Sequence, residues 1–305
     1  MCIMIHQYVT KLADNLPDEF KERKTPLRID LVLDGGLFNG SYLIGALHFL
    51  KELEQRKYIQ IDRISGASIG SVIGLAYLSD SLDSMPDLYN IMYNEMKTSH
   101  TMSCIQNMKQ LLKYDSDLFN KLNNKFYVSY NNTKNRKKVV KCIYKNNDDV
   151  FDTLSKSCHL PFVIDGKLLY KNKYLDGVNP YMFKQCSEKK ILYLDLFGYD
   201  KLLNFFNIKN EKTNYHRILS GMLEMHNFYI KQSDTSMCSY VNEWGIINKS
   251  RFSIKGLNET IIVYSVCILN ILSRYTIGIE KTILYKLFYR IMKEIFGVLV
   301  ETCCI

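Results

Sequence analysis

The sequence predicts an α/β fold, in which a parallel-rich central sheet carries helices on both faces and a helical C-terminal region follows. Residues 28–53 and residues 59–78 each suit a strand, a glycine-containing turn and a helix, and two such units in succession are typical of parallel strands. Residues 191–197, ILYLDLF, suit a further buried strand. Of the 305 residues 47% are hydrophobic, so the chain can bury a sizeable core.

The turn of the second unit is a G-x-S-x-G pentapeptide around Ser68. The alternating residues 59–64 before it suit a strand, and residues 71–78 after it have helical spacing. Such a strand-to-helix turn strains the serine backbone, exposes its hydroxyl and requires small neighbours, which Gly66 and Gly70 provide. The N-terminus of the following helix favours negative charge at the serine. The alternative is a glycine-rich turn with an incidental serine.

The turn of the first unit is residues 34–40, DGGLFNG, which follow the strand RIDLVL. Gly35 and Gly36 lack a Cβ, so their amides can turn toward a ligand oxygen, and a helix N-terminus follows directly. These features suit an oxyanion or a phosphate. The alternative is a plain tight turn. A dinucleotide site fits poorly because the spacing is not G-x-G-x-x-G.

The remaining segments are less regular. Residues 1–27 suit a short helix with a polar connector. Residues 79–138 are polar and weakly periodic, which predicts an insertion over the sheet, such as a lid, with helices near 88–96 and 103–112 and an Asn-rich loop. A strand at 139–144, a helix at 151–158 and a small hairpin at 167–175 lead to Asp176-Gly177. We therefore divide the chain into residues 1–27, 28–198 and a mainly helical 199–305.

The C-terminal region raises the question of membrane contact. Residues 276–300 repeat apolar side chains every three or four positions, which favours a helix docked on the protein's own core, with a membrane surface as the alternative. The apolar run 261–272 contains Asn270 and is shorter than the roughly 18 residues of a membrane span. The chain end does not fit a C-a-a-X motif, but reversible acylation of Cys303 or Cys304 stays open.

The formal net charge of +9 is concentrated in runs such as residues 134–141. A solvated loop or sheet edge is the favoured interpretation of this run. The alternative is attraction to anionic lipid head groups or nucleic acid. The sequence contains no zinc-finger, helix-turn-helix or RNP pattern, so we expect no nucleic-acid partner.

The nine cysteines are odd in number, scattered and without a C-x-x-C pair. This pattern argues against a disulfide framework and a zinc site, and it indicates a reducing compartment. The apolar start at residues 1–5 is too short for a signal peptide and lacks a basic region before it. We expect a cytoplasmic protein, peripheral at membranes, that uses no metal and no cofactor.

Three motifs now stand in order: the loop 34–40, G-x-S-x-G at Ser68, and Asp176-Gly177. Their combination over about residues 29–195 resembles the patatin-like phospholipase family, with its D/S-G-G-G-x-R/K-G loop, G-x-S-x-G and D-G-G/A. Residues 155–161 also resemble the approach to the aspartate in that family. The resemblance implies a three-layer sandwich and a phospholipase A-like lipid acyl hydrolase that acts on phospholipids or other acyl-ester lipids without a metal.

The resemblance also implies roles for single residues. Ser68 would be the nucleophile and Asp176 the base of a Ser-Asp dyad, and an acyl-enzyme would form on Ser68. The backbone amides of Gly35, Gly36 and Leu37 would form the oxyanion hole. The supporting motif residues are Asn39, Gly40, Gly66, Gly70 and Gly177.

The chain departs from the family pattern at three positions. Leu37 replaces the third glycine, Asn39 replaces the basic residue, and Val178 follows a single glycine after the aspartate. Leu37 still has an amide to donate, but a positive φ would cost it more than it would cost glycine. We therefore keep a second hypothesis, of a catalytically impaired patatin-like protein that binds lipid or a protein partner.

A third hypothesis is an α/β-hydrolase with a Ser-His-Asp triad. Asp195 or Asp200 with His216 or His226 would follow Ser68 in the required order. Both histidines lie in sequence with helical spacing, however, so ordinary surface histidines are the favoured interpretation.

Overall fold

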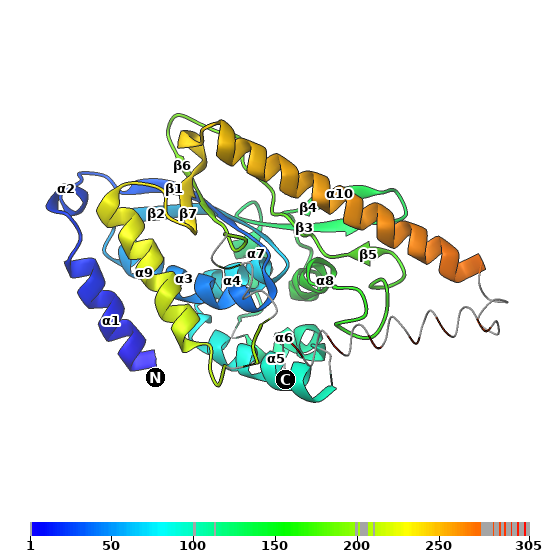
Figure 1. Cartoon of the computed structure of the whole chain (residues 1–305). Helices are drawn as coiled ribbons and strands as arrows, with labels where there is room; N and C mark the ends of the chain where they lie inside the picture. Colours follow the sequence, from blue (N-terminus) through cyan, green and yellow to red (C-terminus); the bar gives the residue numbers. More distant parts are fainter. Residues whose placement is uncertain are drawn as a thin grey trace.

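The computed structural model describes residues 2–99, 102–112, 114–198, 201, 207–209 and 211–275, together with positions 283, 287, 290, 294, 298 and 302. A mixed sheet of seven strands runs through the fold in the order β4-β3-β2-β1-β6-β7, with β5 paired to β3 (Figure 1). The strands are β1 Leu27–Leu33, β2 Ile59–Ala67, β3 Phe126–Asn132, β4 Lys137–Lys141, β5 Tyr174–Leu175, β6 Lys190–Leu194 and β7 Cys238–Tyr240.

The four central strands β3, β2, β1 and β6 are parallel, whereas β4, β5 and β7 pair antiparallel. This arrangement confirms the predicted α/β class with a parallel-rich sheet. It also brings the carboxyl ends of β1 and β2 to one edge, where the loop 34–40 and the G-x-S-x-G turn meet.

Helices cover both faces of the sheet (Figure 1). The α-helices are α1 Cys2–Asp14, α2 Asp18–Lys21, α3 Gly40–Gln55, α4 Ile69–Leu78, α5 Met85–Ser99, α6 Met108–Leu111, α7 Leu118–Leu122, α8 Asn147–Ser157, α9 Tyr215–Lys231 and α10 Ile246–Tyr275. Short 3-10 helices lie at Leu37–Asn39, Ser103–Asn107, Leu82–Ser84 (η2) and Val241–Glu243.

The alternation of side chains along β1 explains the two layers of core. Ile29, Leu31 and Leu33 face the large core that is shared with α1, α3, α4, α5, α8 and α9. Val32 points to the opposite face, where a smaller cluster includes Trp244 and packs against Phe252 of α10. α10 therefore covers one face while most of the other helices cover the second.

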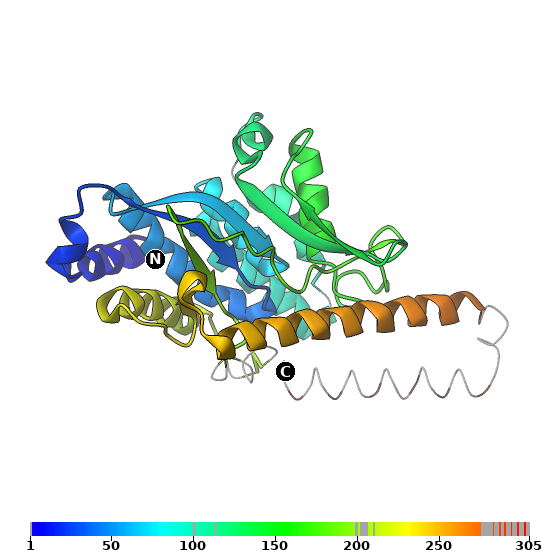
Figure 2. The same cartoon turned by 90° about the horizontal axis from the view of Figure 1, so that it is seen from above.

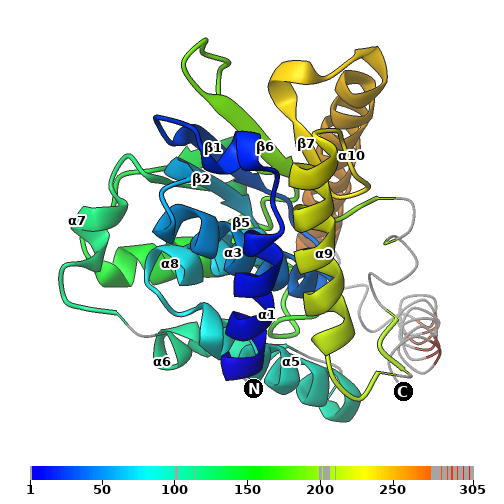
Figure 3. The same ribbon diagram turned by 90° about the vertical axis from the view of Figure 1, so that its left-hand side faces the viewer.

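Two glycines let α9 lie directly on α3, and Figure 3 shows α1 beside this pair. A Cβ on Gly45 of α3 would stand 1.8 Å from the carbonyl oxygen of Ile218, and one on Gly221 of α9 would stand 1.9 Å from that of Tyr42. No larger residue fits this close approach. Because α3 begins at Gly40, the packing places α9 beside the glycine loop.

Two expectations about elements were wrong. Residues 126–132, expected to belong to an Asn-rich loop, form the central strand β3, which carries buried Ser129 and Asn131. Residues 238–240, expected to be in a helical region, form the edge strand β7. The basic run lies at the edge of the sheet, where Lys134–Lys138 are exposed and β4 is an edge strand.

The apolar run 261–272 is part of a much longer helix than expected. α10 has 30 residues. Within the described residues it is the one helix long and apolar enough to cross a membrane, with a mean hydropathy of 1.4. In the structure α10 lies along the domain (Figure 2). The amphipathic segment predicted at 276–300 and the cysteines 303 and 304 lie outside the described residues, apart from isolated positions of that segment.

Candidate active site

Ser68 occupies the sharp turn between β2 and α4, as the strand–turn–helix pattern predicts. Its φ of 50° and ψ of −132° are a strained combination for a residue with a Cβ. A Cβ on Gly66 would stand 2.7 Å from the Ser71 backbone nitrogen, and one on Gly70 would stand 2.4 Å from the carbonyl oxygen of Asp34. These two positions therefore need glycine, and Gly70 lets the turn pack against the loop after β1.

Asp176 directly follows β5 and is only 3% exposed. Its amide donates to the carbonyl of His159 at 3.1 Å, and its carbonyl accepts from Asn131 Nδ2 at 2.9 Å. The Val178 amide donates to Asp176 Oδ1 at 2.7 Å. A Cβ on Gly177 would stand 2.0 Å from the Ser129 carbonyl, so this turn is held directly against β3.

The structure brings Ser68 and Asp176 together. Burial raises the pKa of Asp176 to about 7. Its interactions with the Ser68 side chain and with the Val178 amide lower this pKa, but by less than burial raises it. Asp176 Oδ2 has no closely placed hydrogen-bond partner in the described part of the chain. Contacts between catalytic side chains are often looser than a hydrogen bond when no substrate is bound.

Ser157, at the end of α8, joins these two segments. Its Oγ accepts from the Ser68 amide at 2.9 Å and donates to the Ser129 carbonyl at 2.7 Å. Its own carbonyl accepts from the Gly177 amide at 3.2 Å. Sequence reasoning singled out residues 155–161 as a segment but assigned Ser157 no role.

The glycine loop passes beside Ser68. A Cβ on Gly35 would stand 3.2 Å from the Cβ of Ser68. The Gly35 amide donates to Oδ1 of Asp34 at 3.1 Å, so this amide already has an acceptor. The amides of Gly36 and Leu37 have none in the described part of the chain. Leu37 adopts a φ of +46°, the conformation that is costly for leucine, and its carbonyl accepts from the Tyr89 hydroxyl at 2.9 Å.

Asn39 is completely buried and holds the loop to the rest of the domain. Its Nδ2 donates to the carbonyls of Leu196 at 3.1 Å and Lys201 at 2.9 Å. Its Oδ1 accepts from Nη1 of the buried Arg217 at 2.9 Å. Arg217 also pairs with Glu211 at 2.6 Å. The buried guanidinium of Arg217, from α9, therefore lies beside Asn39, which is the position at which the loop lacks a basic residue.

Lys255 of α10 fixes the other end of the loop. Its Nζ lies 2.7 Å from Asp34 Oδ2 and 2.7 Å from Asp195 Oδ1, and the Tyr193 hydroxyl donates to Asp34 at 2.9 Å. Burial raises the pKa of Asp34 to about 6 even though Lys255 lowers it. Sequence reasoning missed Lys255, because it lies far along the chain from the loop that it contacts.

Glu259, one turn further along α10, supports the Asp176 side of the site. This buried carboxylate accepts from Asn131 Nδ2 at 2.9 Å and from Asn179 Nδ2 at 3.1 Å, and it pairs with Lys138 at 2.8 Å. Asn131 also bonds the Asp176 carbonyl. α10 thus contacts both the glycine loop and the segment that carries Asp176.

With this geometry in place, the chain can be compared with known proteins. The family model described as patatin-like phospholipase matches residues 31–182, about half of the chain and the part that contains all three motifs. Residues 31–182 belong to the patatin-like phospholipase family. A search of curated proteins found no match to the chain. The family acts on lipid esters, so its hydrolases define the broad class of chemistry to consider.

The patatin-like site differs from the family pattern in a consistent way. Leu37 and Val178 both replace a small family residue, and both adopt positive φ, +46° and +45°. Such a conformation is unusual for any residue with a side chain and is a genuine outlier for a β-branched valine. Both loops of this chain therefore hold a residue with a bulky side chain in the conformation that glycine adopts most easily.

The histidines proposed for a triad have other neighbours. His216 is exposed and lies 3.3 Å from Glu211, and His226 stacks edge-on against Phe49 with ring centroids 5.8 Å apart. Asp195 is paired with Lys255. Asp200 lies outside the described residues. His159 follows Ser157 closely, but its ring lies against that of Tyr170, with centroids 5.9 Å apart.

A cavity of about 210 Å³ opens beside Lys255, between β6, β7 and α10. Its lining includes Asp195, Asp234, Trp244 and Arg251. It borders the patatin-like site through Lys255 but does not include Ser68 or Asp176.

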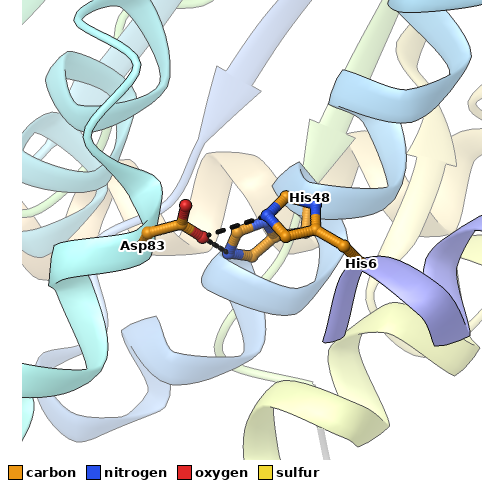
Figure 4. Close-up of side chains that lie close together, drawn as sticks. All are labelled: His6, His48 and Asp83. Carbon is orange, nitrogen blue, oxygen red and sulfur yellow. Dashed lines mark ion pairs between the residues drawn. The ribbon is translucent and has the colours of Figure 1, made fainter. Parts of the chain in front are cut away.

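One group in the described part of the chain has metal-ligand chemistry: His6, His48 and Asp83, from α1, α3 and η2 (Figure 4). The Nε2 atoms of His6 and His48 lie 3.3 Å and 3.9 Å from Asp83 Oδ1. His6 and Asp83 are more than half exposed, and burial lowers the pKa of His48 to about 4. This group is built on different elements from those that carry Ser68 and Asp176.

Proposed function

We propose that the protein is a phospholipase A-like lipid acyl hydrolase that uses Ser68 as nucleophile and Asp176 as base. The observation that carries the proposal is the pairing of a serine in a strained strand-to-helix turn with a buried aspartate. Because burial raises the pKa of Asp176 to about 7, this carboxylate is basic enough to accept a proton near neutral pH.

The proposed reaction has two halves. Ser68 Oγ attacks the ester carbonyl while its proton passes to Asp176, and the tetrahedral intermediate then expels the alcohol, which takes that proton. Water attacks the resulting acyl-Ser68 ester, giving its proton to Asp176, and the acid leaves as Ser68 regains a proton. The Val178 amide holds one oxygen of Asp176, which leaves Oδ2 to exchange protons.

The negative charge of the intermediate needs hydrogen-bond donors. The amides of Gly36 and Leu37 are the proposed donors, because Gly35 already donates to Asp34. The N-terminus of α4 adds favourable electrostatics at Ser68. Each such donor typically accounts for a hundred- to a thousandfold in turnover, so the geometry of this loop decides the rate.

The proposed substrates are phospholipids or other acyl-ester lipids. We propose a cytoplasmic protein that meets its substrate at a membrane surface, with no nucleic acid and no cofactor involved.

A test is hydrolysis of phospholipid in mixed micelles by wild type, Ser68→Ala and Ser65→Ala. Ser65 is a buried serine of β2, and its Oγ has no hydrogen-bond partner among the described residues. Ser65→Ala therefore removes the same kind of oxygen atom as Ser68→Ala, but from a position that takes no part in the proposed reaction. We expect Ser68→Ala to lose activity and Ser65→Ala to keep it. Activity that survives in Ser68→Ala would contradict the mechanism.

The second candidate is a catalytically impaired protein that binds lipid or a partner. The strained φ of Leu37 is the observation that favours it. Leu37→Gly distinguishes the hydrolase from the impaired protein. If the protein is a working but slow enzyme, this substitution should raise turnover more than it changes the apparent affinity for substrate, because the oxyanion exists only along the reaction path. If wild type and Leu37→Gly are both inactive on a broad panel of acyl esters, the non-catalytic function is the better account.

A further inference from the structure

The outward face of α10 is an exposed apolar surface. Its exposed apolar side chains are Ile246, Ile247, Ile254, Leu257, Ile261, Ile262, Tyr264, Ile268, Leu269 and Ile271. Between Leu257 and Ile271 the exposed positions hold only uncharged residues, and the single charged side chain in that stretch, Glu259, is buried. A helix on the surface of a soluble domain normally carries charge on its solvent side, so this face is built for an apolar partner.

The inward face fixes α10 to the domain. Lys255 and Glu259 make the ion pairs described above, and Val263, Val266 and Cys267 pack in a cluster with Leu169 and Leu175. The helix therefore lies along the domain, as Figure 2 shows for its first part, and the exposed apolar side chains named above are on its outward side. An ion-paired helix of this kind is placed to lie on a membrane surface rather than to cross a bilayer.

Basic side chains flank the apolar face. The turn between β3 and β4 exposes Lys134, Arg136 and Lys137, and the Arg136 guanidinium lies 5.7 Å from the ring centroid of Tyr264. Lys249 and Arg251 are exposed near the start of the helix. An apolar stripe bordered by basic residues is the pattern of helices that lie in the interface of anionic bilayers.

We propose that the outward face of α10, together with Lys134, Arg136 and Lys137, is a docking surface for an anionic lipid membrane. This inference rests on the proposed function only in that a lipid substrate requires contact with a membrane. The inner side of the same helix contacts the candidate active site. Lys255 pairs with Asp34 of the glycine loop, and Glu259 accepts from Asn131, which also bonds the Asp176 carbonyl. Docking would therefore bring the site to within one helix of the bilayer.

A second copy of the chain is the competing occupant. Ile254, Ile261 and Ile268 are spaced by seven residues, and each is followed three residues later by Leu257, Tyr264 or Ile271, which is also the spacing of a helix–helix seam. A two-fold contact, however, places the same patch on both partners, so the basic residues beside each helix would face one another. An anionic lipid surface complements that charge, which decides the choice.

The test is co-sedimentation of the full chain with phosphatidylcholine vesicles that contain or lack a fifth of phosphatidylserine. The variant is Ile261→Glu with Ile268→Glu, two side chains that are 55% and 56% exposed. The matched control is Leu219→Glu with Leu223→Glu on α9, where exposure is 42% and 38%. We expect the α10 variant to bind anionic vesicles at least about tenfold more weakly than wild type and the control variant, and we expect salt to weaken wild-type binding.

Equal vesicle binding by wild type and the α10 variant would overturn the proposal, as would a wild type that stays in the supernatant with both vesicle types. A wild-type dimer that the α10 variant converts to a monomer, without vesicle binding, would assign the face to a second copy instead. Hydrolysis of a soluble short-chain ester separates this inference from the proposed function. Vesicle binding without esterase activity refutes only the function, and esterase activity without vesicle binding refutes only the docking surface.

Discussion

The backbone amide of Ser68 donates a hydrogen bond of 2.9 Å to the hydroxyl of Ser157, a residue that no catalytic motif marks. That hydroxyl in turn donates a hydrogen bond of 2.7 Å to the Ser129 carbonyl of β3, and the Ser157 carbonyl accepts from the Gly177 amide. One small side chain therefore sets the position of the proposed nucleophile relative to the proposed base. It also satisfies a buried amide at a strained residue, which would otherwise be costly.

We predict that Ser157→Ala lowers turnover about tenfold or more and destabilises the protein by about 1–3 kcal/mol, because it leaves the Ser68 amide without a buried partner. Ser155→Ala is the control, since that hydroxyl donates to the carbonyl of Phe151 within the same helix α8. Ester hydrolysis and urea unfolding measure the two effects. Equal turnover in both variants would remove Ser157 from the site.

The activity should depend on the protonation of Asp176. Its pKa is raised to about 7 and the base must be ionised, so kcat/KM on a soluble ester should rise with pH through about 7 and level off above it. Asp176→Asn should lose most activity, on the order of a hundredfold or more, whereas His216→Ala and His226→Ala should lose little. A histidine variant as inactive as Asp176→Asn would instead indicate a triad.

The same raised pKa predicts an effect on stability. Between the ordinary pKa of 3.8 and about 7 the folded chain holds a proton on Asp176 that the unfolded chain releases, so this group destabilises the fold increasingly as pH rises. Asp176→Asn removes the penalty while keeping an acceptor for the Val178 amide. We expect it to raise the free energy of unfolding by about 2–4 kcal/mol at pH 8 and by less at pH 5. Urea denaturation at both pH values measures this, and a destabilised Asp176→Asn would contradict it.

Arg217 explains why restoring the basic residue of the loop should fail here. Asn39→Arg would bring a second buried guanidinium against the one that already bonds Asn39, and it should destabilise the protein by about 3 kcal/mol or more. Asn39→Ala, which loses the same hydrogen bonds to Leu196, Lys201 and Arg217 without adding a charge, is the matched control and should be less destabilised. Thermal unfolding decides the point, and an Asn39→Arg variant as stable as wild type would show that Arg217 does not occupy that space.

Local sequence patterns were sufficient to predict the parallel strands β1, β2 and β6 and the turn at Ser68, whereas the pairing of Asp176 with Ser68 was expected only from the resemblance to the patatin-like family. These patterns could not predict β3, because Ser129 and Asn131 look like loop residues in sequence. Both residues are polar because they form hydrogen bonds with Ser157 and Asp176. The strand was therefore missed at the positions where its residues support the candidate site.

The contribution of α10 was also beyond local patterns. Lys255 and Glu259 interrupt the apolar spacing of this helix, so the sequence suggested a short apolar run rather than one long element. Their partners, Asp34 and Asn131, lie far away along the chain, and only the folded sheet brings them together. Long-range polar contacts of this kind leave no periodic signal.

The most direct test of the Ser68–Asp176 dyad is labelling of the purified protein with a fluorophosphonate probe, followed by mapping of the modified residue by peptide mass spectrometry. The dyad predicts one label, on Ser68, at a rate that rises with pH through about 7 and falls on the order of a hundredfold in Asp176→Asn. Labelling at a different serine, or labelling of Ser68 at an unchanged rate in Asp176→Asn, would contradict it.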